Sequence, residues 1–484
     1  MSGGRASLAS PKRRRGRRSE PLTLPIYVIN RARDGERLAG FAASAEALGL
    51  PFARIEAFDG HDPAAPVFLY RDLIPERFWG GETIKPGAFG CALSHLAAWR
   101  RMLADGADAA LICEDDARLI ADPASARPDG PFDVVFANRR TADWLAAAGA
   151  EGFLSAAEVV AALDAPPSPP GADAYLVSRR GAERLISAVE ETGVVAGIDW
   201  LILSRGLPAE AAAWEETAAL DRDAASARGF SVFVAPKPVA EAAGGASVIA
   251  HSETAPLDAL RAAAPTFDFD LPPAFAADPV ATDWAAGRFH EAPALELAFR
   301  WFPRGGLFVD VGAHIGNHTL FMLRHAGAAR AVAFEPHARA GAALKAVLEA
   351  SGLADCVDLS HLGFGLAEEA GRREAKGGRR AGYAQRLRPG FDEAVRVRAG
   401  DALLRGEAPA MIKIDVGGEE REVLKGLRKT VKRARPLLLI DLTHPKSTKA
   451  RPLLERLGYA EAEQVEWSEG ETRRRTAIFR AVAA

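Results

Sequence analysis

Residues 307–316 read Leu-Phe-Val-Asp-Val-Gly-Ala-His-Ile-Gly, an apolar run that is interrupted by one acid and two glycines. The five residues after it have helical character, so the pattern predicts a buried parallel strand, a tight turn and the start of a helix. Gly312 permits the turn, and Gly316 permits close packing at the helix start. Such a turn can present a nucleotide-like ligand to a helix N-terminus. On this stretch alone, a plain turn in any α/β protein is the alternative.

His314 makes a pyrophosphate ligand less suitable. It stands where the fingerprint Gly-x-Gly-x-x-Gly of dinucleotide-binding proteins has its middle glycine, so no pyrophosphate is expected close against this turn. The next strand, 331–334, ends in Glu335, about twenty residues past the glycines, where an acid can hydrogen-bond ribose hydroxyls. The pattern therefore favours a ligand with a ribose and without a pyrophosphate.

The end of the chain separates two classes of cofactor. Strands are expected at 357–362, 411–416 and 436–442, followed by a hairpin of 463–467 and 476–482. A nicotinamide-binding domain finishes with parallel strands, whereas a class I methyltransferase finishes with an antiparallel one. The hairpin and the missing glycine favour S-adenosylmethionine as the cofactor. They argue against the alternative, an oxidoreductase.

Residues 288–482 resemble the FkbM family of S-adenosylmethionine-dependent methyltransferases. The likeness is carried by Val309–Thr319, Ala333–Pro336, Ile412–Glu419 with Val423–Gly426, and Pro436–Asp441 with His444. It implies a class I, Rossmann-like domain over 288–484. It also implies four cofactor-binding residues, the first three around the methionine and the last on the ribose: Asp310, Gly312, Gly316 and Glu335. Asp415 is the expected residue that orients or deprotonates a hydroxyl acceptor, with His444 as a second candidate.

Two positions depart from the FkbM pattern. The family usually has Glu where this chain has Gly417, and Glu where it has Asp441. Glu419 or Glu420 could replace the missing carboxylate. If that carboxylate is essential and is not replaced, the domain binds the cofactor without efficient turnover, which is the alternative interpretation of this half.

The first half opens with a strand-helix-strand pattern. A buried strand at 26–30, a helix at 37–48 and a strand at 52–58 predict a parallel sheet. A later strand, 109–113, ends in Glu114-Asp115-Asp116. Three adjacent carboxylates repel one another, so they need either good solvation or a hard divalent cation among them. On the triplet alone, an acidic turn before a helix is the alternative.

Residues 24–252 resemble glycosyltransferase family 25, the lipooligosaccharide-type galactosyl- and glucosyltransferases. The matching blocks are Tyr27–Asn30 with Arg37, Ala57–Gly60, Gly87–His95 leading to Trp99, Leu111–Asp116, Ala174–Ser178 with Gly181-Ala182, and Gly197–Asp199. The resemblance implies a GT-A-like domain over 23–252 and a nucleotide-sugar donor such as a UDP-hexose.

The same resemblance implies roles for single residues. The expected donor-binding residues are Asn30, Arg37 and Asp59, and the expected ligands of Mn²⁺ or Mg²⁺ are Glu114, Asp115 and Asp116. The ion would stabilise the leaving diphosphate. Asp199 is the candidate base for the acceptor hydroxyl. For His95, a structural and a chemical role are both open.

The remaining segments and the composition complete the prediction. Residues 1–22 form a basic arm that could touch anionic lipid weakly, and residues 253–287 are expected to be a linker. The net charge of −3 gives no reason to expect a nucleic-acid partner. Three separated cysteines without paired metal spacing, and the absence of a membrane-spanning apolar run, suit a cytoplasmic protein, with a peripheral position at the inner membrane as an open alternative.

Together these patterns predict a bifunctional enzyme that modifies a surface polysaccharide or glycolipid. One domain would transfer a sugar, and the other would O-methylate a hydroxyl. The alternative is that one domain is an inactive binding module. Gly417 makes the methyltransferase domain the stronger candidate for that role.

Overall fold

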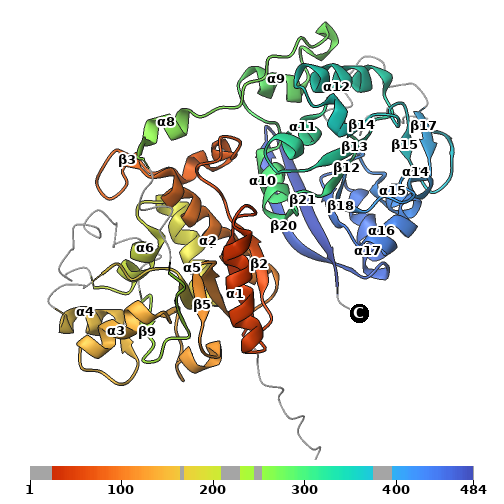
Figure 1. The fold of residues 1–484 in the computed structure, drawn as a ribbon. Helices are drawn as coiled ribbons and strands as arrows, with labels where there is room; N and C mark the ends of the chain where they lie inside the picture. Colours follow the sequence, from red (N-terminus) through yellow and green to blue (C-terminus); the bar gives the residue numbers. More distant parts are fainter. Residues whose placement is uncertain (1–23, 164–167, 209–228, 245–252, 374–394, 483–484) are drawn as a thin grey trace, which may run out of the picture.

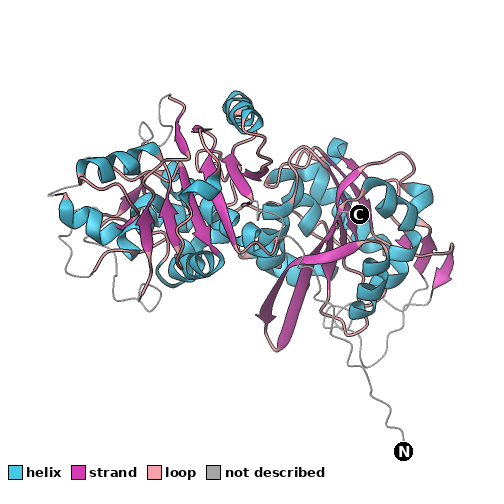
Figure 2. Ribbon diagram, turned by 90° about the horizontal axis from the view of Figure 1, so that it is seen from below, coloured by secondary structure: helices cyan, strands magenta, loops and turns pink. Residues whose placement is uncertain are grey.

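The structure is a computed structural model that describes residues 24–163, 168–208, 229–244, 253–373 and 395–482. Two seven-stranded sheets form two separate lobes, one before and one after residue 290 (Figure 1). Helices cover both faces of each sheet (Figure 2). The α/β class with two sheet-containing lobes, predicted from the sequence, is confirmed. The basic arm lies outside the described residues. Among those residues, no helix combines the length and the apolar character needed to cross a membrane.

The first sheet is mixed, with the strand order β2-β1-β4-β8-β6-β9-β7. Strands β2, β1 and β4 are parallel, and β8 enters antiparallel to β4. The strands are β1 (Ile26–Asn30), β2 (Ala53–Glu56), β4 (Ala109–Glu114), β6 (Val134–Phe136), β7 (Leu154–Ser155), β8 (Ala174–Ser178) and β9 (Val232–Val234). Strand β1 is buried on both faces, because Tyr27 and Ile29 pack into one core while Ile26 and Val28 pack into the other.

Among the described residues, six helices and two short strand pairs surround this sheet. The helices are α1 (Gly35–Ala47), α2 (Pro86–Ala104), α3 (Arg139–Ala147), α4 (Ala156–Ala162), α5 (Arg179–Thr192) and α6 (Ile198–Arg205). The strand pairs are β5 (Ala117–Leu119) with β10 (Ala240–Ala242), and β3 (Thr83–Ile84) with β11 (Ala255–Pro256). Because β1, β2 and β4 are parallel, the loops after them meet at one edge of the sheet.

The second sheet has the order β14-β13-β12-β18-β19-β21-β20. The first five of these strands are parallel, and β21 is antiparallel to β19. The strands are β12 (Leu307–Val311), β13 (Arg330–Phe334), β14 (Val357–Asp358), β18 (Pro409–Ile414), β19 (Leu437–Asp441), β20 (Tyr459–Glu469) and β21 (Thr472–Ala481). The closing hairpin of a class I methyltransferase is thus confirmed. Strand β14 is shorter than predicted, because the Ser360 amide turns back onto Asp358 Oδ1 at 2.9 Å.

The second lobe has seven helices after residue 290 and one small side sheet among the described residues. The helices are α10 (Ala292–Trp301), α11 (Asn317–Arg324), α12 (Ala338–Ala350), α14 (Gly400–Leu403), α15 (Glu420–Gly426), α16 (Arg428–Ala434) and α17 (Arg451–Arg456). The side sheet contains β15 (Gly365–Leu366), β16 (Gly371–Arg373) and β17 (Val395–Arg398).

The segment predicted to be a linker, 253–287, is packed against both lobes. Strand β11 pairs with β3 of the first lobe, and α8 (Leu257–Ala262) follows it. Helix α9 (Pro279–Ala285) belongs to the second lobe, because Val280 and Trp284 lie in the core that also holds α11. The hydrophobic pattern of residues 253–287 is weak, so the sequence did not predict these short elements.

Helix α10 lies where the lobes meet (Figure 1). The Phe299 ring on α10 contacts the Phe58 ring of the first lobe, with centroids 5.8 Å apart. Arg480 on the hairpin pairs with Asp105 at the end of α2. The relative position of the lobes therefore depends on both aromatic packing and an ion pair.

Candidate active sites

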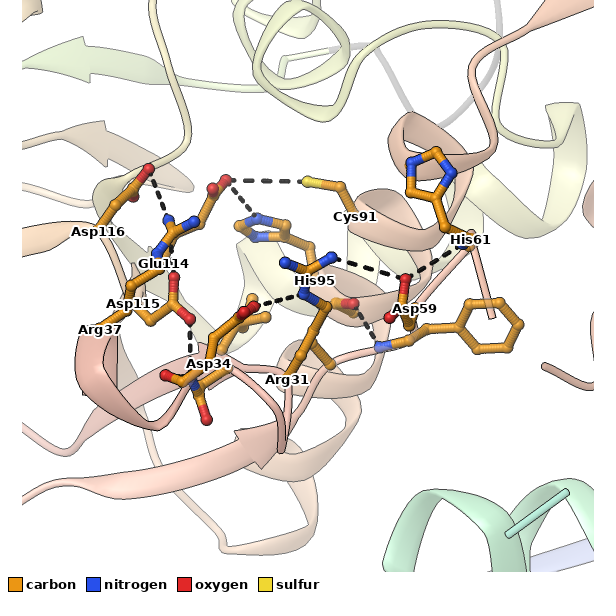
Figure 3. A pocket seen from close by; sticks show the side chains of 17 residues that line it. Arg31, Asp34, Arg37, Asp59, His61, Cys91, His95, Glu114, Asp115 and Asp116 are labelled. Atoms are coloured by element: carbon orange, nitrogen blue, oxygen red, sulfur yellow. Dashed lines mark hydrogen bonds and ion pairs between the residues drawn. The ribbon is translucent and has the colours of Figure 1, made fainter. Parts of the chain in front are cut away.

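A pocket with an empty volume of about 670 Å³ opens at the carboxyl ends of β1, β2 and β4 (Figure 3). Its walls come from the loops after β1 and β2, from α1, from one face of α2 and from the residues that end β4. The three predicted donor-binding residues all line it: Asn30, Arg37 and Asp59. This pocket lies at the ligand-binding edge of the sheet.

Asn30 and Asp59 are held by charged neighbours. Asn30 Nδ2 donates to Asp115 Oδ2 at 2.7 Å, and Asn30 Oδ1 accepts from Arg54 Nε at 2.8 Å. Asp59 Oδ2 pairs with the Arg33 guanidinium at 2.6 Å. These contacts hold the Asn30 and Asp59 side chains in place at the rim of the pocket without a ligand.

The acidic triplet does not converge on one point. The Arg37 guanidinium lies 2.8 Å from Asp115 Oδ1 and 2.9 Å from Asp116 Oδ2. Glu114 instead faces α2, with Oε1 3.3 Å from His95 Nε2 and 3.8 Å from Cys91 Sγ. Neighbouring residues at a strand end alternate in direction, which separates Glu114 from Asp115.

The electrostatics of the triplet are correspondingly uneven. Burial, followed by the charge of Glu114, raises the pKa of Asp116 to about 6. Burial also opposes the charge on Glu114, but the hydrogen bond and charge of His95, together with Arg37 and Arg140, outweigh it and lower the pKa of this carboxyl. Ionisation of Glu114 is therefore favoured, whereas Arg37 only partly offsets the burial and repulsion that oppose the charge of Asp116.

A divalent cation fits two of the three carboxylates. Asp116 Oδ1 is buried and accepts no hydrogen bond, and the negative charge of Glu114 lies close to it. A cation between Glu114 and Asp116 would remove both defects. Asp115 is already satisfied by Asn30 and Arg37.

Asp199 lies at the start of α6. Its Oδ2 accepts from the Gly171 amide at 3.1 Å and its Oδ1 from the Trp200 amide at 2.9 Å. Burial raises its pKa despite these hydrogen bonds. Trp79 was not singled out from the sequence, yet its half-exposed ring lies beside Asp199 across Gly197, with its backbone in the left-handed region at φ +46°. A positive φ at a tryptophan is strained, and such strain gathers at functional sites.

His95 is fully buried on α2. Its Nδ1 lies 2.8 Å from the Tyr175 hydroxyl, which also accepts from Trp99 Nε1 at 2.8 Å. Its other nitrogen faces Glu114 in the pocket. One side of the ring thus has a structural role, and the other side is available to a ligand.

The predicted turn after β12 forms in the second lobe. Gly312 has a φ of +87°, and a Cβ there would lie 2.0 Å from the Asp415 carbonyl oxygen, so only glycine fits. Gly316 (φ +101°) precedes α11, and His314 between them is also left-handed at φ +50°. The turn therefore places strained backbone at the carboxyl edge of the sheet.

Asp310 lies beneath this turn and not at its surface. It is fully buried, its Oδ2 accepts from Thr319 Oγ1 at 2.8 Å, and its Oδ1 accepts from Lys413 Nζ at 3.0 Å. Burial opposes the charge on Lys413, but Asp310 and then Asp415 outweigh it and raise the pKa of Lys413 to about 12. Asp310 thus shapes the turn from behind through a buried ion pair.

Glu335 stands at the end of β13, as predicted. Its Oε2 accepts from the His314 amide at 2.9 Å, and its Oε1 accepts from the His337 amide at 2.8 Å. Each oxygen keeps a second lone pair, so the carboxylate can accept hydrogen bonds from a diol. Glu335 and the Gly312 turn fit the ribose and methionine ends of S-adenosylmethionine.

Three carboxylates gather beside this turn. Asp415 follows β18, Asp441 ends β19 and Glu291 precedes α10. Burial and the charge of Asp415 raise the pKa values of both Glu291 and Asp441. Glu291 was missed in the sequence; its only signal was an acid before a helix, and its positive φ of 57° shows only in three dimensions.

The second predicted acceptor-site residue, His444, packs against the loop that follows Asp415. Its ring lies against Gly418, where an added Cβ would come within 2.4 Å of Nδ1, and Nδ1 accepts from the Lys446 amide at 3.1 Å. Glu420 accepts from the Gly418 amide at 2.9 Å and stabilises the loop, while Glu419 is exposed beside Arg373. Their contacts give both glutamates structural roles in this conformation.

Comparisons with known proteins agree with this division. Residues 23–124 match the family model described as glycosyltransferase family 25 (LPS biosynthesis protein), and residues 310–461 match the methyltransferase FkbM domain. Asp199 lies outside the first match. A segment of 98 residues aligns with two curated proteins at 29% identity each. They are a probable inactive glycosyltransferase 25 family member 3 of Rattus norvegicus and an inactive glycosyltransferase 25 family member 3 of Mus musculus. It covers 19% of this chain and 17% of each relative.

Two solved methyltransferase structures are similar to part of this chain. The methyltransferase FkbM from Methylobacillus flagellatus is 22% identical, with 36% of this chain and 43% of that chain covered and a TM-score of 0.28. The tRNA methyltransferase TrmK of B. subtilis is 17% identical, with 39% and 65% covered and a TM-score of 0.28. The two family matches confirm the predicted fusion: this chain joins a glycosyltransferase family 25 region to an FkbM methyltransferase domain.

Proposed function

We propose that the chain is a bifunctional glycan-modifying enzyme with two separate sites. The first lobe, taken as 23–252, would transfer a hexose from a UDP-sugar to a glycan hydroxyl. The second, taken as 288–484, would O-methylate a hydroxyl of a surface polysaccharide or glycolipid. The observation that carries the proposal is that each family region ends its central strands in its own acidic site: Glu114 to Asp116 in one lobe, and Glu335 with Asp415 in the other.

For sugar transfer, Glu114 and Asp116 would hold Mn²⁺ or Mg²⁺, which stabilises the charge of a leaving diphosphate. Asn30 and Asp59 would contact the nucleotide side of the donor from the pocket rim. Asp199, whose pKa is raised by burial, would accept the proton of the acceptor hydroxyl. Its place outside the pocket lining, beside the exposed Trp79, suits a separate acceptor side.

For methyl transfer, Glu335 would bind the ribose of S-adenosylmethionine, and the Gly312–Gly316 turn would surround its methionine end. The cofactor supplies an electrophilic methyl group when it is bound. Asp415 would hold the acceptor hydroxyl and take its proton, with Glu291 and Asp441 beside it. Burial and the charge of Asp415 disfavour ionisation of both neighbours and so limit the repulsion at the acceptor site.

The two sites would act on one glycan. A covalent connection raises the effective concentration of the second site once the first has bound a chain. The basic cluster at residues 12–18 would add a weak attachment to anionic lipid. Flotation with anionic liposomes tests that attachment: binding should weaken with salt and disappear when residues 1–20 are deleted.

Reciprocal substitutions test the two-site proposal. UDP release from UDP-hexoses with Mn²⁺ reports the first site, and transfer of labelled methyl to crude glycan reports the second. Asp116→Ala should abolish UDP release and spare methyl transfer, and Glu335→Ala should do the converse. Asp129→Ala and Glu349→Ala, at exposed positions, are matched controls. A single substitution that removes both activities from a folded protein contradicts the proposal.

A second candidate function is a first lobe that binds a nucleotide-sugar without turnover. The observation that favours it is the position of Arg37. Its guanidinium lies 2.8 Å from Asp115 Oδ1 and 2.9 Å from Asp116 Oδ2, and it supplies the positive charge that a cation would bring. The rat and mouse relatives are themselves described as inactive. Calorimetric binding of UDP without UDP release from any UDP-hexose would support this candidate, and Mn²⁺-dependent release would exclude it.

A further inference from the structure

Three side chains of different chemistry meet at the inner wall of the donor pocket. Cys91 Sγ, His95 Nε2 and a Glu114 carboxylate oxygen all lie within 4.8 Å of one another. Among the described residues, no other group of three His, Cys, Asp or Glu side chains meets this criterion. Cys91 and His95 are four residues apart on α2 and so share a helix face, which points at the end of β4 (Figure 3).

Two of the three ligand separations are close to those of a tetrahedral metal site. Bonds from zinc of about 2.0 Å to nitrogen, 2.1 Å to oxygen and 2.3 Å to sulfur place nitrogen and oxygen about 3.4 Å apart, and sulfur and oxygen about 3.6 Å apart. His95 Nε2 and Glu114 Oε1 are 3.3 Å apart, and Cys91 Sγ and Glu114 Oε1 are 3.8 Å apart. Shifts of a few tenths of an ångström would bring these two pairs to that geometry, and the third pair, Cys91 Sγ and His95 Nε2, lies within 4.8 Å.

The surroundings of His95 complete the pattern. A metal-binding histidine usually donates its other N–H to a partner that fixes the ring. The Tyr175 hydroxyl lies 2.8 Å from Nδ1 and accepts from Trp99 Nε1 at 2.8 Å, and its second lone pair can accept from His95 Nδ1–H. That tautomer leaves the Nε2 lone pair directed at Glu114 and the pocket.

We propose that Cys91, His95 and Glu114 bind one Zn²⁺ or Co²⁺ ion, with a fourth position open to the pocket. A thiolate and an imidazole favour these ions over Mn²⁺ and Mg²⁺, which prefer oxygen ligands. Binding releases to solvent the Cys91 thiol proton and the proton that His95 Nε2 donates to Glu114 in the metal-free site, because only a thiolate and an unprotonated ring nitrogen are ligands. The site shares Glu114 with the oxygen-ligand site proposed above, so the two ions exclude each other.

This proposal does not depend on sugar or methyl transfer, and its test measures the metal alone. The full-length chain is freed of metal with EDTA and titrated with Co²⁺. A thiolate-to-cobalt charge-transfer band should appear and saturate at one equivalent. Cys91→Ser should remove the band, and Cys356→Ser, a change to a cysteine of similar exposure in the other lobe, should keep it. Tyr175→Phe should weaken Zn²⁺ affinity about 10- to 100-fold without abolishing it.

The absence of the band in the unchanged chain would overturn the proposal, and so would a band that survives in Cys91→Ser. Circular dichroism checks that the variant is folded. If it is not, alkylation of the unchanged chain gives the same answer, because Zn²⁺ should slow labelling of Cys91 and leave Cys356 unaffected. Equal labelling of Cys91 with and without Zn²⁺ also overturns the proposal.

Discussion

His314 Nε2 lies 2.8 Å from Asp278 Oδ2, and this contact joins the turn after β12 to the start of α9. Asp278 also caps α9, since its Oδ1 accepts from the Val280 amide at 3.0 Å. The Phe275 ring packs beside the His314 ring, with centroids 5.9 Å apart. The left-handed backbone of His314 is therefore stabilised by residues about forty positions earlier in the chain.

Asp278→Asn should weaken S-adenosylmethionine binding while leaving the helix cap intact. A hydrogen bond to a charged group contributes about 1.5–3 kcal/mol, so we expect the Kd to rise about tenfold or more. Asp278→Ala should also lower the stability of the second lobe by about 1 kcal/mol through the lost cap. Calorimetry gives the Kd, and Asp270→Asn, at an exposed position nearby, is the control. An unchanged Kd in Asp278→Asn would show that His314 does not depend on this contact.

The sequence predicted the turn itself but not its support. Alternating and continuous apolar runs mark strands, so β12, β13, β18 and the hairpin were found, and Glu335 followed from its spacing. Asp278 lies in a segment without periodicity, and only the folded chain brings it to His314. No local pattern carries such a contact.

The acidic triplet is a second case in which the sequence predicted the residues but not their directions. Three consecutive acids predicted one shared site, yet the direction of a side chain at a strand end depends on the residues that face it. Arg37 draws Asp115 and Asp116 one way, while His95 draws Glu114 the other. The four-residue spacing of Cys91 and His95 was the available signal for a second ligand set.

Gly312→Ala should disrupt the cofactor turn, because the added Cβ would meet the Asp415 carbonyl oxygen at 2.0 Å. Gly305→Ala is the matched control, since Gly305 has a similar φ of +78° and open space at the Cβ position. We expect a cost of about 1–2 kcal/mol at Gly305 from backbone strain alone. At Gly312 we expect a larger loss and no measurable S-adenosylmethionine binding. Equal losses in urea unfolding would show that close packing at Gly312 is unimportant.

Glu463→Ala should be among the more damaging substitutions on the hairpin. Glu463 accepts from Arg300 NH1 and NH2 at 2.8 Å and 2.6 Å, and only 8% of the Arg300 side chain is exposed. Glu463→Ala leaves Glu296, 2.6 Å from Arg300 Nε, as the remaining partner of the guanidinium, and it also removes the acceptor of Trp301 Nε1. Breaking a buried pair completely costs about 3–5 kcal/mol, so we expect a loss near the lower end of that range. Glu461→Ala, which removes a half-exposed pair with Arg451, should cost less than about 1 kcal/mol.

Urea unfolding distinguishes these two variants. The transition that S-adenosylmethionine shifts to higher urea identifies the second lobe, because a ligand stabilises only the part that binds it. Similar midpoints for Glu463→Ala and Glu461→Ala would mean that water replaces the Glu463 carboxylate around Arg300.

The stability of the metal-free first lobe should fall as pH rises from about 4 to 6, and Asp116 should be one cause. Burial and then Glu114 raise the pKa of Asp116 from 3.8 to about 6, so in this window the folded protein holds a proton that the unfolded chain has lost. The folded state is thus favoured at the acid end of the window and loses that advantage by pH 6. Asp116→Asn should remove this contribution, so its stability relative to the unchanged chain should increase between pH 4 and pH 6. The comparison is made in EDTA by urea unfolding, with Asp129→Asn as the exposed control.

Adding Mn²⁺ should stabilise the unchanged chain above pH 6 more than at pH 4.5, because the ion binds the ionised carboxylate. A pH-independent difference between Asp116→Asn and the unchanged chain would mean that Arg37, 2.9 Å from Asp116, already compensates its charge and leaves no need for a cation.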